Sequence, residues 1–118
     1  MLDVLSDTDR TGRVRGQAAG AIAEQLEFSS SADPMRRVAE ATLLELLHDP
    51  SPMVRFWSAF ALGKLRTTAA LPVLQELKKD RTPVPLWWTV GEEASDAIEL
   101  IEGRHPPARV SKPDPGTR

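Results

Sequence analysis

The residues of this chain that could do chemistry are few, and three acids near its end come closest to a catalytic arrangement. Glu92, Glu93 and Asp96 lie close together, and paired carboxylates can act as general acid and base. Acids are also favoured at the start of a helix by the helix dipole. Because no histidine, cysteine or positioned nucleophile lies near them, we expect these acids to form a solvated helix face.

Two adjacent tryptophans form the most unusual dipeptide of the chain. Trp87 and Trp88 follow a proline-rich connector and, with Trp57, are all the tryptophans present. Tryptophan is enriched at binding hot spots, since it offers a large apolar area and one N–H donor. The alternative is that one ring covers the end of the core and the other covers the connector. Adjacent helical residues point about 100° apart, so the two rings are expected to differ in burial.

Four basic residues on or just after two predicted helices are a second candidate partner-binding set. They are Arg36, Arg37, Lys78 and Lys79, and they could hold an acidic partner or a phosphate backbone. The alternative for the two lysines is structural, because positive charge is favourable at a helix C-terminus. His48, near the end of a predicted helix, is expected to be structural as well.

Composition excludes several classes of function. A length of 118 residues allows one domain. With no cysteine, no tyrosine and two histidines, we expect no metal, no cofactor and no catalytic residue. Residues 1–102 carry 11 bases and 16 acids, a net charge of −5, which argues against nucleic-acid binding. No apolar run is long enough for a membrane span and the start does not resemble a signal peptide, so we expect a cytoplasmic protein without membrane association.

A motif repeats along the chain. Residues 14–22 are similar to residues 54–62 at an offset of 40, and residues 90–98 form a weaker third copy. Each copy has apolar residues at helical spacing, and further helical patterns cover about 34–48 and 69–79. The sequence therefore predicts an all-α fold of two alternating kinds of helix, with little or no sheet. Glycines inside the repeated helices, such as those at 16 and 63, are attributed to close approach of a neighbouring helix.

The central part of the chain resembles a HEAT repeat, closest to the short bacterial type named after phycobilisome lyases. The residues that carry this resemblance are Asp49-Pro50-Ser51-Pro52-Met53-Val54-Arg55, Ser58-Ala59-Phe60-Ala61-Leu62-Gly63-Lys64-Leu65 and Ala70-Leu71-Pro72-Val73-Leu74. The resemblance implies a right-handed α-α superhelix, a HEAT-like solenoid of about two and a half helix-pair repeats. The repeats are expected near 7–49, 50–80 and 84–102 of a domain over 1–103. A disordered proline-rich tail is expected over 104–118.

The signature positions of the repeat are an acid and a Val-Arg pair. They are Asp9, Val14 and Arg15 in the first repeat and Asp49, Val54 and Arg55 in the second. A functional ladder of basic and acidic groups is one interpretation. The structural interpretation, which we favour, is that the acid caps a helix or pairs with an arginine of an adjacent repeat. In the third repeat Gly91 replaces the arginine.

These features favour a non-enzymatic protein–protein interaction module, a small scaffold or adaptor whose partner is another protein. No nucleophile, metal or phosphate-loop constellation is present, and a curved helical stack offers an extended binding surface. One alternative is an enzyme subunit similar to the phycobilin lyases, which act on a tetrapyrrole–protein linkage. A less favoured one is nucleic-acid binding, as in HEAT-like DNA glycosylases. Self-association is a further possibility through apolar solenoid ends, especially around Met1, Leu2, Val4 and Leu5.

Overall fold

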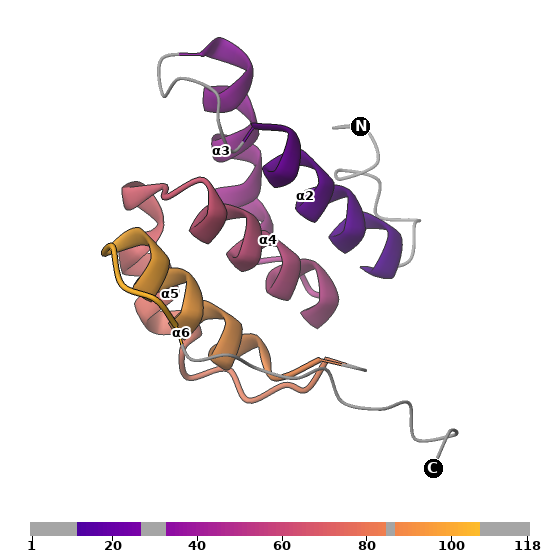
Figure 1. The fold of residues 1–118 in the computed structure, drawn as a ribbon. Coiled ribbons are helices and arrows are strands. Elements are labelled where there is room, and N and C mark those ends of the chain that lie inside the picture. Colours follow the sequence, from indigo (N-terminus) through magenta and orange to yellow (C-terminus); the bar gives the residue numbers. More distant parts are fainter. Residues whose placement is uncertain (1–11, 27–32, 85–86, 107–118) are drawn as a thin grey trace.

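The computed structural model describes residues 12–26, 33–84 and 87–106, without the side chains of residues 12–15 and 17. This part of the chain is helical (Figure 1), and its only strand-like pairing is one isolated antiparallel bridge between Pro83 and Thr89. The all-α prediction is confirmed. The helices are α2 (Gly12–Leu26), α3 (Pro34–Leu46), α4 (Pro52–Lys64), the 3-10 turn η1 (Thr68–Ala70), α5 (Leu71–Leu77) and α6 (Val90–Ile101).

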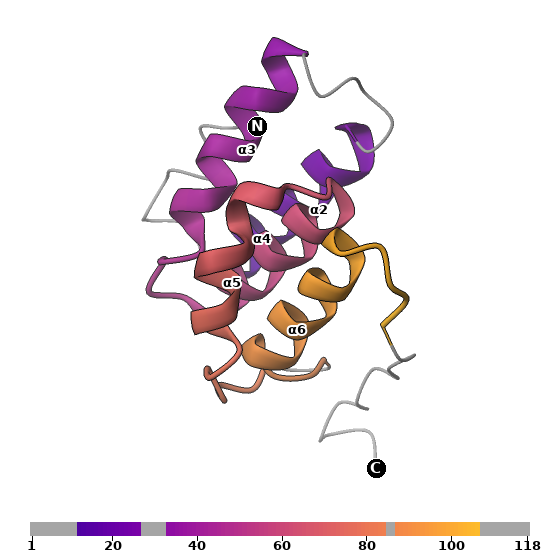
Figure 2. The ribbon, with the colours of Figure 1, turned by 90° about the vertical axis from the view of Figure 1, so that its left-hand side faces the viewer.

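Successive helices alternate between two layers. Helices α2, α4 and α6 lie side by side in one layer, the front layer, and α3 and α5 form the other, the back layer (Figures 1 and 2). Helix α4 is central, since it packs against α2, α3 and α6. This position explains its apolar sequence, with Val54, Phe56, Ala59 and Leu62 all at most 1% exposed. The alternation is the one that the repeated sequence pattern predicts.

Prolines and short polar side chains set the starts of the helices. Pro34 and Pro52 occupy the first positions of α3 and α4, where a missing N–H costs little. Asp33 caps α3 by accepting the backbone N–H of Met35 at 2.9 Å. Thr89 begins α6 with a capping box, in which its side chain and that of Glu92 each accept a backbone N–H of the other residue.

Two glycines allow neighbouring helices of the front layer to approach closely. A Cβ atom on Gly63 of α4 would lie 2.8 Å from Cα of Ala97 in α6. A Cβ on Gly16 of α2 would lie 2.6 Å from Cδ1 of Trp57 in α4. Glycine inside a helix costs about 1 kcal/mol relative to alanine, and the close helix packing compensates for that cost. The expectation of close approach is confirmed at both positions.

Several predictions concern residues outside the described ones. Asp9 and the apolar residues around Met1 lie outside them, and Val14 and Arg15 belong to α2 but have no described side chains. The described chain extends beyond residue 103 to Pro106, which is half-buried. Arg104 there forms ion pairs with glutamates at 99 and 102. The remainder of the predicted tail, 107–118, is not described.

Candidate functional site

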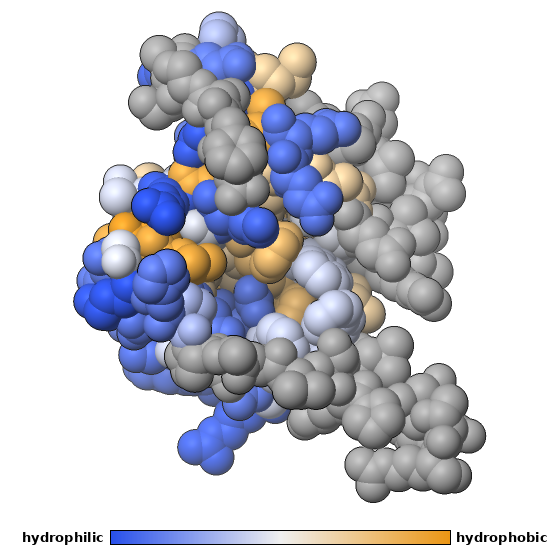
Figure 3. Space-filling model, viewed as in Figure 1, coloured by the Kyte–Doolittle hydropathy of each residue, from blue (hydrophilic) through white to orange (hydrophobic). Residues whose placement is uncertain are grey.

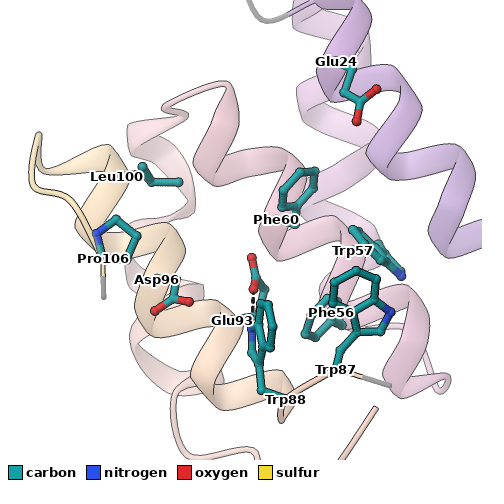
Figure 4. Close-up of a pocket in the computed structure, with 10 residues that line it drawn as sticks. All are labelled: Glu24, Phe56, Trp57, Phe60, Trp87, Trp88, Glu93, Asp96, Leu100 and Pro106. Atoms are coloured by element: carbon teal, nitrogen blue, oxygen red, sulfur yellow. Dashed lines mark hydrogen bonds between the residues drawn. The ribbon is translucent and has the colours of Figure 1, made fainter. Parts of the chain in front are cut away.

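Five aromatic rings gather at one end of the front layer. Phe56, Trp57 and Phe60 come from α4, and Trp87 and Trp88 come from the connector before α6 (Figure 4). Ring centroids are 5.3 Å apart for Trp57 and Trp87, and 5.8 Å apart for Phe56 and Trp88. Several pairs are nearly perpendicular, including Trp57 with Phe60 at 82°. Such edge-to-face contacts are favourable, and they turn the ring faces in different directions.

The connector is folded back so that both tryptophans reach α4. Val84 donates its backbone N–H to the carbonyl of Trp88 at 3.3 Å, and Trp87 donates its own to the carbonyl of Val84 at 2.9 Å. Val84 is 2% exposed and lies in an apolar cluster with Phe56. These contacts form a tight loop whose buried anchor is a valine.

Both tryptophans are half-buried, so the structure does not divide them into one buried ring and one exposed ring. The reason is that Trp87 and Trp88 precede α6, which begins at Val90. The angle of about 100° between adjacent helical residues therefore does not apply to them. Both rings instead pack on the same residue, Phe56.

The acids of α6 are the second component of the site. Glu93 is 5% exposed and Asp96 is 8% exposed, so the predicted solvated face is wrong for both. Helix α6 packs on α4 and α5 together, which covers most of its circumference. Oε1 of Glu93 accepts a hydrogen bond from Nε1–H of Trp88 at 2.7 Å (Figure 4). Glu92 has the helix-start role that the sequence suggests, as part of the capping box.

A cavity of about 460 Å³ lies between these aromatic and acidic residues. Leu100 and Pro106 complete its wall on the side of α6, and Glu24 of α2 stands on the opposite side (Figure 4). A smaller hollow of about 300 Å³ adjoins it along α2. Apolar and pale residues occupy the middle of this face in Figure 3, with hydrophilic residues above and below. We call the larger cavity, with its lining residues, the aromatic pocket.

The signature residues of the second repeat have structural contacts. Arg55 donates from Nε to Asp80 at 3.0 Å and from Nη1 to the carbonyl of Asp49 at 2.7 Å. Asp49 accepts the backbone N–H of Ser51 at 2.8 Å. Asp80 follows α5 and accepts the backbone N–H of Thr82 in the same way, at 2.9 Å. Arg55 thus links the acidic turns on either side of its repeat, as the structural interpretation predicts.

Asp80 gives this link a pH dependence. Burial alone would raise the pKa of Asp80, but hydrogen bonds from Thr82 and the guanidinium of Arg55 outweigh it and hold the pKa below its ordinary value. The folded state therefore gains stability from the charged carboxylate above the unfolded pKa of about 3.8. This contribution is lost as the pH falls through the folded pKa.

We expect Asp80→Asn to lower the free energy of unfolding by about 1–3 kcal/mol at pH 7, because a hydrogen bond to a charged group is lost. The difference between the variant and the parent should shrink as the pH is lowered from about 5 to about 2. Urea unfolding at several pH values measures it. A difference that stays constant over this range would contradict the assigned role of the charge.

Arg36 is engaged inside the molecule. Its guanidinium donates to the carbonyl of Leu26 at 3.4 Å and to the carbonyl of Leu65, and its Nε lies 3.8 Å from Glu40. Leu26 ends α2 and Leu65 caps α4, so one side chain satisfies carbonyls at two helix C-termini, where positive charge is favourable. The sequence did not predict this structural role.

The other basic candidates are exposed but are not brought together. Arg37 lies at the start of α3, and Lys78 and Lys79 follow the end of α5. Figure 2 places these two points at opposite ends of the back layer. Lys79 pairs with Glu76 at 3.5 Å on the surface, a contact worth little. No joint basic site therefore forms among these described residues.

Within the described ranges there is no group of three or more histidine, cysteine, aspartate or glutamate side chains that could hold a metal ion. None of the helices in this part of the chain combines the length and apolar character that crossing a bilayer requires.

Two layers of alternating helices, stacked through their apolar faces, define an α-helical repeat protein. A family model of HEAT repeats matches residues 1–89, which is most of the chain, and the chain belongs to the HEAT-repeat family. No curated protein matches it, and neither does any solved structure. The match ends at Thr89, so α6 and its two buried acids lie beyond the matched residues.

Proposed function

We propose that this chain is a non-enzymatic protein–protein interaction module, a small cytoplasmic scaffold or adaptor that holds its partner at the aromatic pocket. Family membership supports the general function, since solenoids of stacked helices provide extended surfaces for protein binding. The proposed site lies on the layer of α2, α4 and α6. It is therefore on the opposite face from the basic residues of α3 and α5.

One observation supports this location most strongly. All three tryptophans of the chain line the aromatic pocket, and each of them is half-buried. Tryptophan is enriched among hot-spot residues, and the part of each ring that stays exposed is available to a partner. The pocket volume of about 460 Å³ falls in the range of ligand-binding clefts.

We expect Trp87→Ala to abolish or strongly reduce capture of a partner from native lysate, because it removes a ring shared by the pocket walls. Truncating a hot-spot residue costs about 2 kcal/mol or more, a loss of about 30-fold in affinity. Trp87→Phe is the matched variant, since it keeps an aromatic ring and should retain more of the capture. Trp87 is preferred to Trp88, whose removal would leave buried Glu93 without its indole donor.

The control for the opposite face is the double variant Arg37→Ala/Lys79→Ala, whose two side chains are exposed. It should capture the partner as the parent does, and the circular dichroism of every variant should remain helical. Loss of the partner in this double variant, with full capture by Trp87→Ala, would move the site to α3 and α5 and contradict the proposal.

The resemblance to phycobilin lyases is a separate prediction from the sequence, carried by residues 49–80. Titration with a bilin, followed by visible absorbance, decides it. A saturable absorbance shift would favour an enzyme subunit over an adaptor without activity of its own. Self-association through the solenoid ends is likewise a prediction, which light scattering at high protein concentration tests.

A further inference from the structure

We infer that the aromatic pocket binds the guanidinium group of an arginine side chain in a basic segment of the partner protein. This inference rests on the proposed function and adds the chemistry that the site recognises. The aromatic walls, the charges beside them and the shape of the guanidinium group support it.

The walls offer electron-rich ring faces to a cation. Trp57 stands edge-to-face with both Phe60 and Trp87, at interplanar angles of 82° in each case. Trp57, Phe60 and Trp87 all line the cavity and each stays partly exposed, so aromatic surface is open to a ligand there. The face of tryptophan is the best aromatic site for a cation. Lys64, which lies one helical turn after Phe60 on α4, places its ammonium 5.8 Å from the ring centroid of Phe60.

The charged residues that line the pocket are all acidic. Among its described lining residues three are acidic, Glu24, Glu93 and Asp96, and none is basic. Glu93 lies in the first turn of α6, where the helix dipole favours the charged carboxylate. The Trp88 indole holds this carboxylate at 2.7 Å, which fixes its position in the wall. The pocket is therefore complementary to a cation and opposed to an acidic or phosphate-bearing ligand.

Arginine satisfies both features better than lysine does. The planar guanidinium can stack on an aromatic face while its N–H groups, which lie in the plane of the group, point to carboxylates at the edges. The ammonium of lysine is a compact, strongly hydrated charge that loses more hydration in an apolar pocket. A cavity of about 460 Å³ has room for the guanidinium, its alkyl stem and part of the adjoining peptide.

The test uses the pocket's own reporters. Because every tryptophan of the chain lines the pocket, intrinsic fluorescence of the full-length protein reports occupancy directly. The probe is a blocked Gly-Gly-Arg-Gly-Gly peptide, compared with the same peptide carrying citrulline, which keeps the shape of arginine without its charge. We expect a saturable emission change, with the arginine peptide about tenfold tighter than the citrulline peptide and weaker at high salt. Equal affinities, or no saturable change up to about 10 mM peptide, would overturn the inference.

Charge variants locate the binding. Glu24→Gln combined with Asp96→Asn should lower the affinity for the arginine peptide by about threefold or more, without changing the affinity for the citrulline peptide. Glu45→Gln, an exposed charge change on α3, is the matched control and should have no effect. An equal loss of affinity for both peptides would point to a disturbed fold, and would count against a role of these two carboxylates in binding arginine.

The basic residues of the chain's own end are the competing occupant. Residues 107–118 carry three bases and one acid and follow Pro106, which lines the pocket. The full-length variant Arg109→Ala/Lys112→Ala distinguishes a partner's arginine from the basic residues of the chain's own end. Peptide binding by this variant and not by the parent would overturn the partner assignment and give the pocket to the chain itself.

Failure of this inference is distinguishable from failure of the proposed function. If Trp87→Ala loses the captured partner while the arginine and citrulline peptides bind alike, the pocket is a protein-binding site that does not recognise arginine. If Trp87→Ala keeps the partner, the location of the site fails whatever the peptides do.

Discussion

Phe56→Ala should lower the free energy of unfolding by about 3–5 kcal/mol. Phe56 is 1% exposed, and its ring packs against all three tryptophans, with centroids 5.1–6.2 Å away. Removing it leaves a void next to the pocket. For a domain of this size a loss of about 1 kcal/mol corresponds to about 4 °C in Tm, so the variant should melt about 12–20 °C lower.

The same substitution should also disturb the pocket, because Phe56 supports Trp87 and Trp88 from below. We expect a red shift of the tryptophan emission in the folded variant. Met35→Ala is the matched control, since Met35 is a large apolar residue that is 63% exposed, and it should change stability by no more than about 0.5 kcal/mol. A loss below about 1 kcal/mol for Phe56→Ala would mean that the ring is not the support described.

Gly63→Val is expected to cost about 3 kcal/mol or more, near the upper end for overpacked interiors. The first added carbon would lie 2.8 Å from Cα and 2.9 Å from Cβ of Ala97, and these backbone and Cβ atoms cannot rotate away. Helices α4 and α6 must then separate, which opens the contact beside the aromatic pocket. Valine is a better helix former than glycine, so part of the cost is offset and the measured loss is a net value.

Ala41→Val on α3 is the control for this second variant, because Ala41 is exposed and the same residue is introduced into a helix. Urea unfolding gives the free energy of unfolding of both variants, which can be compared directly if their m-values are equal. An equal small loss in the two variants would show that α4 and α6 tolerate wider spacing, and would contradict the close contact at Gly63.

Much of the fold follows from local pattern. The repeat offset and the apolar spacing predict the helices and their alternation, since each amphipathic helix must bury one stripe against its neighbours. The link from Arg55 to Asp80 is predictable for the same reason, because a repeated acidic turn places equivalent groups in adjacent repeats. The glycines are interpretable because glycine inside a helix requires a compensating contact.

The pocket could not be predicted in this way. The sequence predicts Glu93 and Asp96 to be solvated, because sequence position alone does not reveal that α6 packs on two helices at once. Glu93 also accepts the indole N–H of Trp88, which the connector brings back through the backbone contact between Val84 and Trp88. Arg36 is similar, since its acceptors at Leu26 and Leu65 are 10 and 29 residues away along the chain. Such contacts are set by tertiary geometry and leave no periodic signal.

The most direct test of the central claim is the proton–nitrogen correlation spectrum of the labelled protein, recorded before and after addition of the unlabelled captured partner. The three tryptophans give three indole signals, and all three belong to residues lining the aromatic pocket. We predict that the indole signals of Trp57 and Trp87 shift or broaden, while the amides of Arg37 and Lys79 stay in place. Shifts at Arg37 and Lys79 with unchanged indole signals would contradict the account and place the partner on α3 and α5.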